Sequence, residues 1–258
     1  MATSLVLSLL LFVFLLGVIS LSISLKPFSF QAKPIKLSPS LFYGLVLSIS
    51  ALFAAASFII VNFGTAPWLQ ILYYLLFLSG IFLNAIVLSD KPIVRRLLLV
   101  GGLGICLLFF ATTSPWSQNL LMAISLLWVG PSLVQRLKIS TPYLLVSIGL
   151  GALADIYSVW LSRVTPAFDD SALFLNGIIS VGDYSIGLGD FAFASLAVAL
   201  LVRERKVGAA WLAAVLIAFV RFGLRIIFPW LGDIPYVAVI AALFLVLYIY
   251  SPLPSGRS

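Results

Sequence analysis

Long apolar stretches alternate with short polar loops along the whole chain. A transmembrane helix needs about 20 mostly apolar residues, because each residue adds about 1.5 Å and the bilayer core is about 30 Å thick. The pattern therefore predicts an all-α polytopic membrane protein with nine transmembrane helices. The predicted spans are Ser4–Leu25, Leu41–Phe63, Trp68–Ser89, Val94–Thr113, Asn119–Val134, Tyr143–Leu161, Gly187–Val202, Val207–Phe228 and Ile234–Ser251.

The loops between these spans alternate in charge. The first, third, fifth and seventh carry lysine and arginine, including Lys26, Lys91, Arg136 and Arg203, whereas the even-numbered loops are neutral or acidic. Because basic loops are retained on the cytoplasmic side, the alternation predicts an N-terminus outside and a C-terminus inside. No basic residue precedes Lys26, so we expect the first span to be retained rather than cleaved as a signal peptide.

The composition is typical of a membrane protein and limits the catalytic and metal-binding chemistry that the chain can perform. Hydrophobic residues make up 63% of the chain and charged residues 9%, against about 25% charged in a typical soluble domain. Histidine is absent and Cys106 is the only cysteine, which excludes Ser-His and Cys-His nucleophiles, HExxH zinc sites and internal disulfides. We expect no cofactor. The net charge of +7 is explained by the basic loops, so no nucleic-acid partner is expected.

Two aspartates lie inside predicted spans, while the other acidic residues fall in loops. An ionisable group at the middle of a transmembrane helix costs about 2.5–3.5 kcal/mol on insertion scales, so it is a candidate functional group. Asp155 follows Tyr143 by 12 residues in the sixth span, and Asp190 precedes Val202 by 12 residues in the seventh. Because these spans run in opposite directions, both carboxyls are expected about 18 Å from the cytoplasmic side.

A pair of carboxyls at one depth is suited to hydrolysis. Two close carboxyls cannot readily both ionise, so they share a proton and titrate as a pair. One then acts as general base on a water while the other protonates the scissile carbonyl. Gly187 and Gly189 lack a Cβ, so a substrate backbone can approach the start of the seventh span closely. The structural alternative is that Asp190 caps a helix or pairs with an arginine.

The stretch Ile186–Leu196, with the sequence IGLGDFAFASL, resembles the GxGD helix of the presenilin and signal peptide peptidase family of intramembrane aspartyl proteases. Residues Asp155–Trp160 resemble the helix of that family's first aspartate, with Ala154 where the family usually has tyrosine. Residues 235–237 occupy the place of the family's Pro-Ala-Leu motif and keep its proline. The resemblance covers mostly spans six to nine, and the predicted orientation is similar to that of signal peptide peptidase.

The resemblance implies a presenilin-like bundle, in a prokaryotic or archaeal chain, that cleaves transmembrane helices or signal peptides in the plasma membrane. Residues 1–258 would form one membrane domain, with spans one to five (1–138) as scaffold and spans six to nine (139–258) as the catalytic part. The implied catalytic residues are Asp155 and Asp190, and the implied substrate-binding residues are Gly187, Leu188, Gly189, Pro235, Tyr236 and Val237.

Three other features lie near this site. Arg221 and Arg225 are four residues apart in the eighth span, and we expect them to pair with acidic residues of the outer loops. The loop Ser171–Ile186 carries Asn176-Gly177 between apolar runs, which predicts either a β-hairpin or a re-entrant segment. Pro235 is expected either to leave a carbonyl unpaired beside the site or simply to open the ninth helix.

Three other functional classes share these features. A proton-coupled transporter or channel would use both aspartates and Arg221 as a relay, but would tend to show paired repeats and interrupted helices. A prepilin-peptidase-like protease also carries GxGD, but usually has a lysine soon after this aspartate, and Phe191 begins a run without one. A non-catalytic scaffold is the third class.

The topology can be tested by cysteine labelling in intact cells. In a Cys106→Ala background, a single cysteine in the loop Asp169–Asp183 should react with an impermeant maleimide from outside, whereas Ser258→Cys should react only after permeabilisation. This follows because the basic loops hold the C-terminus inside. Labelling of Ser258→Cys in intact cells would show that the predicted orientation is wrong.

Overall fold

The structure, a computed structural model, describes residues 2–26, 38, 40, 44, 67–89, 91–112, 115–157, 159, 178–181, 184–204, 206–227 and 234–251. Over this part of the chain it is mostly helical, with a single short β-hairpin. The helices are α1 (Ala2–Ser24), α3 (Pro67–Val87), α4 (Pro92–Thr112), α5 (Pro115–Ser125), α6 (Val129–Pro131), η1 (Ser132–Arg136), α7 (Thr141–Ile156), α9 (Leu188–Arg203), α10 (Val207–Ile227) and α11 (Tyr236–Tyr250). The strands are β1 (Ile178–Val181) and β2 (Tyr184–Gly187).

Most of the predicted spans coincide with helices. The first, third, fourth, sixth, seventh, eighth and ninth correspond to α1, α3, α4, α7, α9, α10 and α11. The seventh begins and ends one residue later than predicted, at Leu188 and Arg203. The second, Leu41–Phe63, lies outside the described residues apart from Gly44. The hydropathy pattern therefore located these helices well, because each is a long apolar segment bounded by polar or proline-containing loops.

The fifth predicted span, Asn119–Val134, is not a continuous helix. Helix α5 ends at Ser125, a turn covers residues 126–128, and the chain continues as α6 and then as the π-helix η1. The cause is Pro131, since proline has no N–H and its ring clashes with the carbonyl one turn earlier. The N–H of Gly130 donates instead to the hydroxyl of Ser195 in α9, at 3.1 Å. The prediction of an uninterrupted fifth span was wrong, because hydropathy does not register a helix-breaking residue.

The strands β1 and β2 form an antiparallel hairpin directly before α9. Val181 pairs with Tyr184, so the hairpin connection is Gly182-Asp183. The turn predicted at Asn176-Gly177 precedes β1 and lies outside the described residues, so both alternatives for that segment stay predictions. The observed hairpin is a later one, formed by the strands on either side of residues 182–183.

Burial explains the register of this hairpin. Ile179 and Ile186 are cross-strand partners in this register, and both side chains are buried, at 0% and 3% exposure. Because a one-residue slip in a strand moves every side chain to the opposite face, burial of this pair fixes the register. The register in turn fixes where β2 ends and α9 begins.

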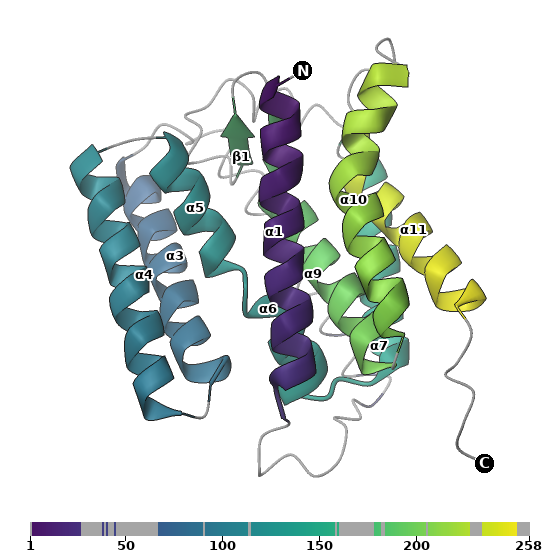
Figure 1. The fold of residues 1–258 in the computed structure, drawn as a ribbon, viewed down its shortest axis with the longest axis horizontal. Helices are drawn as coiled ribbons and strands as arrows, with labels where there is room; N and C mark the ends of the chain where they lie inside the picture. The colour runs from purple at the N-terminus through teal and green to yellow at the C-terminus, as the bar shows by residue number, and fades with distance from the viewer. Residues whose placement is uncertain are drawn as a thin grey trace.

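Helix α9 lies at the centre of the bundle, with α1, α7, α10 and α11 packed around it (Figure 1). All of its residues from Ala194 to Val202 are buried. Phe191 packs edge-on against Phe14 of α1, with the ring centroids 5.1 Å apart. A helix that is apolar and buried on every side is typical of the centre of a bundle. The helix that carries Asp190 is therefore held by neighbours on all sides.

Helices α3, α4 and α5 pack on one another and form a second group beside α1 (Figure 1). Gly80 of α3 lies so close to the backbone of Ser125 in α5 that an added Cβ would overlap it. The amide of Asn84 in α3 donates to the carbonyl of Ile124 in α5, at 2.5 Å. Small residues and interhelical hydrogen bonds of this kind are the usual means by which helices associate without a hydrophobic driving force.

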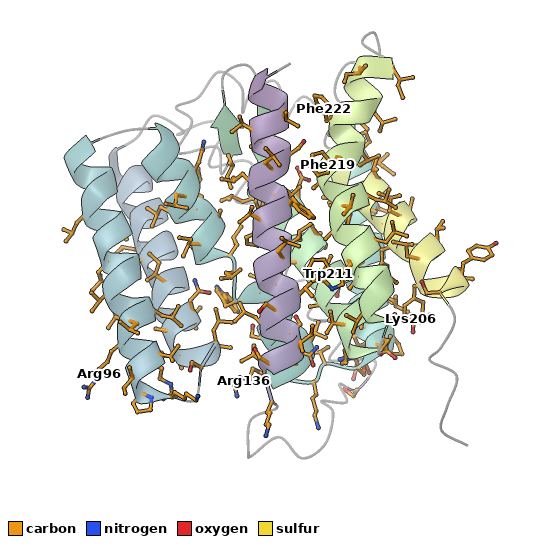
Figure 2. The ribbon with its side chains drawn as sticks, in the orientation of Figure 1. Arg96, Arg136, Lys206, Trp211, Phe219 and Phe222 are labelled. Carbon is orange, nitrogen blue, oxygen red and sulfur yellow. The ribbon has the colours of Figure 1, made fainter. Side chains whose placement is uncertain are left out.

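Basic residues gather at one end of the bundle, which we call the basic end and define by Arg96, Arg136 and Lys206 (Figure 2). Arg136, expected in a loop, lies in η1 and is 1% exposed. Its guanidinium donates to the carbonyl of Val87 at 2.8 Å and to that of Lys26 at 2.9 Å. These carbonyls stand at the ends of α3 and α1, where no intrahelical donor is available. One buried arginine thus caps two helices and faces the negative ends of their dipoles.

Among the described residues, two helical segments are long and apolar enough to cross a membrane, Leu5–Ser24 and Val207–Leu224. By length and composition alone, the core helix of a soluble protein or a signal sequence would pass the same test. The outer surface of the bundle is also apolar in places. Large apolar side chains are exposed along the outer faces of α4, α10 and α11, namely Ile93, Leu97, Val100, Leu103, Leu107, Trp211, Leu212, Val215, Leu216, Leu245, Val246 and Ile249.

Candidate functional site

Asp190 lies in the first turn of α9, directly after the hairpin. Gly187 is both the last residue of β2 and the N-cap residue of α9, with extended backbone angles of φ −66° and ψ 149°. Its N–H donates to Oδ2 of Asp190 at 3.0 Å, and the Asp190 side chain is buried. The carboxylate therefore closes the start of its own helix, at the end where a negative charge is stabilised.

Asp155 lies in the last turn of α7 and is half-buried. Its Oδ2 accepts hydrogen bonds from the N–H of Val237, at 2.7 Å, and from the N–H of Ala238, at 3.4 Å. These are the second and third residues of α11, and the residue before that helix, Pro235, provides no side-chain cap. Asp155 thus supplies from α7 the cap that α11 lacks in its own sequence.

The predicted binding residues at 235–237 are therefore placed beside Asp155. Pro235 stands immediately before α11, so of its two expected roles the structure shows the one at the start of a helix. Tyr236 and Val237 are both buried. The hydroxyl of Tyr236 donates to the carbonyl of Ile217, which ties the start of α11 to α10. This bond holds in place the N–H groups that reach Asp155.

The other predicted binding residues, Gly187, Leu188 and Gly189, form the entry to α9. Leu188 is half-buried, and Gly189 is exposed. A Cβ added at Gly187 would lie 3.5 Å from Oδ2 of Asp190, whereas one added at Gly189 would meet no atom within 4 Å. The backbone at Gly189 therefore borders open space next to the Asp190 carboxylate. A glycine at this point leaves room for another backbone to approach.

Helices α7 and α9 are antiparallel and are joined at the basic end. The Arg203 guanidinium, at the end of α9, donates to the carbonyl of Ile139 at 2.6 Å and to the hydroxyl of Thr141 at 2.8 Å, at the start of α7. The Thr141 hydroxyl in turn donates to Glu204 at 2.8 Å. The last turn of one helix therefore lies beside the first turn of the other.

A second contact joins the same helices further along. Gly151 of α7 lies so close to Phe193 of α9 that an added Cβ would overlap the aromatic ring. Gly151 follows Thr141 by 10 residues and Phe193 precedes Arg203 by 10 residues, which is about 15 Å along each helix. The two contacts agree in register, so α7 and α9 stay in step over this length.

This register brings the two aspartates to matching depth. Asp155 comes four residues after Gly151, and Asp190 comes three residues before Phe193. Residues three and four apart lie on one face of a helix. Both aspartates therefore lie about one turn beyond the Gly151–Phe193 contact along their helices. The expectation that their carboxyls face each other stays a prediction.

The local chemistry favours charge at both positions. Each carboxylate accepts backbone N–H groups at a helix N-terminus, Asp190 from its own helix and Asp155 from α11. Such N–H groups stabilise a carboxylate without a basic side chain. Each carboxylate thus caps a helix, Asp190 capping α9 and Asp155 capping α11.

Several residues that contribute to this geometry were missed from the sequence. Gly151, Phe193, Thr141 and Arg203 align the two helices, yet none was a predicted site residue. The available signal was the pair Gly149 and Gly151 in an apolar span, since small residues mark places where helices approach closely. Hydropathy identifies the span but not its partner, so the Phe193 contact could not be read from it.

Some expected partners cannot be placed. Asp183, Asp169, Asp170 and Asp233 lie outside the described residues, as do the side chains of Arg221 and Arg225 in α10. The expected ion pairs of these arginines therefore stay predictions. Cys106 is buried with a free thiol. In the described part of the chain, no group of three or more histidine, cysteine, aspartate or glutamate side chains comes together as a metal site.

No protein-family model matches the chain, and no curated protein matches it either. The function of this chain is therefore inferred from its own residues and their geometry.

The Gly151–Phe193 contact yields a stability prediction. Gly151→Ala should destabilise the protein by about 1–3 kcal/mol, because a methyl group there overpacks the contact between α7 and α9. Gly149→Ala is the matched control, since an added Cβ at that position meets no atom within 4 Å. Thermal melting of both variants in detergent measures the difference. Adding Phe193→Leu to Gly151→Ala should recover part of the loss, and equal melting of both alanine variants would contradict the proposed contact.

Proposed function

We propose that this chain is an intramembrane aspartyl endopeptidase that cleaves transmembrane helices or signal peptides. The observation that carries the proposal is the pairing of α7 and α9, joined at Arg203 and at Gly151, which supports a similar depth for Asp155 and Asp190 along these two helices. The exposed backbone at Gly189 supports it, because a substrate strand needs access beside the carboxyls. The resemblance of the GxGD helix to presenilin and signal peptide peptidase points to the same chemistry.

The membrane arrangement is part of the proposal: nine spans in the plasma membrane, with the N-terminus outside and the C-terminus inside. Two features support it. The predicted basic loops meet at one end of the bundle, where Arg136 binds the carbonyl of Lys26 and Arg203 binds the start of α7. The outer faces of α4, α10 and α11 are apolar and exposed, and such surfaces are rarely left to water.

The mechanism follows from two carboxyls that share one proton. One carboxylate takes a proton from a water as it attacks the scissile carbonyl, and the other, protonated, donates to the carbonyl oxygen. A substrate helix hides its carbonyls in its own hydrogen bonds, so it must unwind locally before water can attack. The open space at Gly189 lies next to Asp190 and gives the unwound backbone a place to lie.

Helix α11 positions Asp155 in this mechanism. The N–H of Val237 donates to Oδ2 of Asp155 and so fixes the orientation of that carboxylate. Tyr236 anchors the same helix start to α10 through the carbonyl of Ile217. Catalytic groups must be held to within fractions of an ångström, so this backbone contact is a positioning element.

One observation favours a second candidate, a proton-coupled transporter or channel. The turn at residues 126–128, between α5 and α6, interrupts a predicted span, and broken helices often line transport sites. The N–H of Gly130 donates to the Ser195 hydroxyl inside the bundle. This backbone group next to the break is therefore bonded to protein and does not line a transport pathway. Proton uptake into proteoliposomes that depends on both aspartates, without peptide cleavage, would favour this candidate.

The central prediction is that Asp155→Asn and Asp190→Asn each lower cleavage by at least about 10³-fold. Each carboxyl needs the other, so the double variant should be no worse than either single variant. Asparagine keeps a carbonyl oxygen for the capping N–H groups, so both variants should remain folded. The assay is cleavage of a single-span substrate in proteoliposomes, with fragments identified by mass spectrometry.

Two results would contradict the dyad. Cleavage retained in either single variant would exclude that carboxyl, and loss of cleavage in Asp183→Asn alone would assign the activity to a residue outside the pair. Cleavage should also disappear at high pH, where both carboxyls ionise and the shared proton is lost. A pH profile that stays flat into the alkaline range would contradict a shared proton.

The contact from α11 can be tested through its backbone. Val237→Pro removes the N–H that binds Asp155, whereas Val237→Ala keeps it. Proline is tolerated in the first turn of a helix, and α7 of this chain already has Pro142 at the equivalent place. Val237→Pro should lower the cleavage rate about tenfold or more, the scale expected for a misplaced catalytic group, while melting changes little. Equal activity of the proline and alanine variants would show that the contact does not position Asp155.

A further inference from the structure

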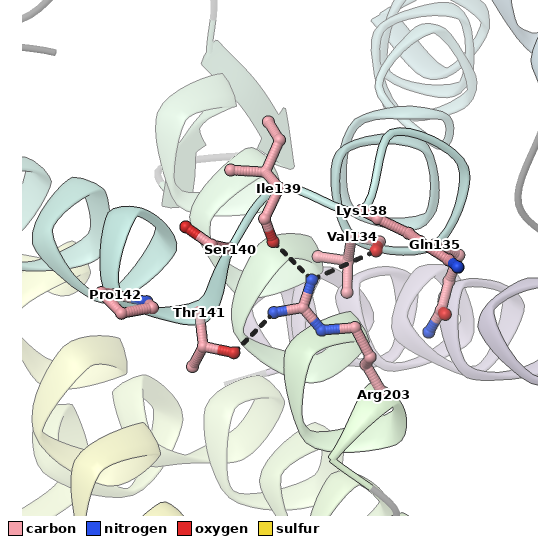
Figure 3. A pocket seen from close by; sticks show the side chains of 8 residues that line it. All are labelled: Val134, Gln135, Lys138, Ile139, Ser140, Thr141, Pro142 and Arg203. Atoms are coloured by element: carbon pink, nitrogen blue, oxygen red, sulfur yellow. Dashed lines mark hydrogen bonds between the residues drawn. The ribbon is translucent and has the colours of Figure 1, made fainter. Parts of the chain in front are cut away.

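An open pocket lies at the basic end, between η1 and the start of α7 (Figure 3). Gln135 and Lys138 border it on the η1 side, Thr141 and Pro142 border it on the α7 side, and the guanidinium of Arg203 lies between them. Asp155 and Asp190 lie 14 and 13 residues away along α7 and α9 from Thr141 and Arg203, or about 20 Å. This pocket is therefore separate from the candidate catalytic site.

Arg203 forms the inner wall of the pocket and is fixed there. Its Nη1 donates to the carbonyls of Val134, at 3.3 Å, and Ile139, at 2.6 Å, and its Nη2 donates to the Thr141 hydroxyl. Burial lowers the pKa of Arg203 below its usual value, and the nearby Glu204 carboxylate acts in the opposite direction. The guanidinium stays charged, because arginine is not deprotonated in proteins. Its neutral carbonyl partners leave much of that positive charge uncompensated.

Lys138 supplies a second cation at the rim. In the described part of the chain its ammonium has no hydrogen bond and no ion pair. The acidic group facing this end is Glu204, whose carboxylate lies 3.6 Å from Nε of Arg203 and also accepts the Thr141 hydroxyl. Glu204 offsets one of the two positive charges, so the pocket retains a net positive charge.

Apart from Ser140, the remaining lining is apolar. Val134, Ile139 and Pro142 contribute to the wall beside these two cations. A small inorganic anion would gain little from such a wall, because apolar atoms give it no hydrogen bonds. A lipid headgroup fits better, since its phosphate can meet the cations while its glycerol and first methylenes cover the apolar residues. Basic pockets between helices on the cytoplasmic side of a membrane are suited to anionic headgroups.

We propose that this pocket binds the headgroup of an anionic phospholipid, with Lys138 and Arg203 contacting the phosphate and Ile139 and Pro142 contacting the glycerol and upper acyl chains. The inference rests on the membrane placement in the proposed function, with this end at the cytoplasmic leaflet. It does not depend on peptide cleavage. A lipid bound here would bridge the two segments that Arg203 already joins, so it would also stabilise the start of α7.

The test is lipid titration of the full chain in a neutral detergent, followed by native mass spectrometry. Dioleoylphosphatidylglycerol should bind, and dioleoylphosphatidylcholine should bind more weakly, because its headgroup carries no net charge. Lys138→Gln should weaken binding of the anionic lipid about fivefold, the effect expected for one basic residue at an anionic surface. Lys91→Gln is the matched control, since Lys91 is exposed and lies outside the pocket. It should leave binding unchanged.

Three outcomes would overturn the proposal. They are equal binding by Lys138→Gln and Lys91→Gln, equal binding of the two lipids, and displacement of the anionic lipid by an excess of inorganic phosphate, which would assign the pocket to free phosphate. Asp190→Asn should bind the anionic lipid as the unmodified chain does. That variant separates the two proposals, because a failed cleavage assay would leave the lipid result standing and a failed lipid titration would leave the cleavage result standing.

Discussion

The site depends on the antiparallel contact between α7 and α9. Two bonds from Arg203 fix it at the basic end, and the close approach of Gly151 to Phe193 fixes it about 15 Å further along. Two points of attachment on a pair of rigid helices leave little freedom to slide, so the depth of each aspartate follows from contacts that neither aspartate makes. Asp155 and Asp190 are therefore not needed to hold α7 and α9 in register.

The same carboxylates still take part in the fold, since each one caps a helix. Asp155 caps α11 from α7, and Asp190 caps α9 through Gly187. A charged group in an apolar bundle is costly unless hydrogen bonds stabilise it, and these backbone N–H groups do so without adding a counter-charge. The two candidate catalytic residues therefore also have a structural role, as caps of α11 and α9.

The sequence was sufficient to predict those features of the fold that depend on local composition. The apolar runs located α1, α7, α9 and α11, and the two carboxyls stood out because charge is rare in such segments. It was insufficient wherever two local signals competed or a distant partner decided the outcome. Pro131 interrupts a run that hydropathy predicts as one helix, and burial of Ile179 with Ile186 determines the register of β1 and β2. The sequence predicted Arg136 in a loop. Its burial could not be predicted, because the carbonyls that it binds come from segments far away in the chain.

Arg136 has a consequence for the order of assembly. The carbonyls that it caps precede it by 49 and 110 residues. During synthesis, α1 and α3 therefore emerge long before the residue that completes their ends, and those ends must rely on water or lipid headgroups in the meantime. The early helices become locked to one another only when η1 arrives, so the first half of the chain stays adjustable until the segment that leads into α7 has been made.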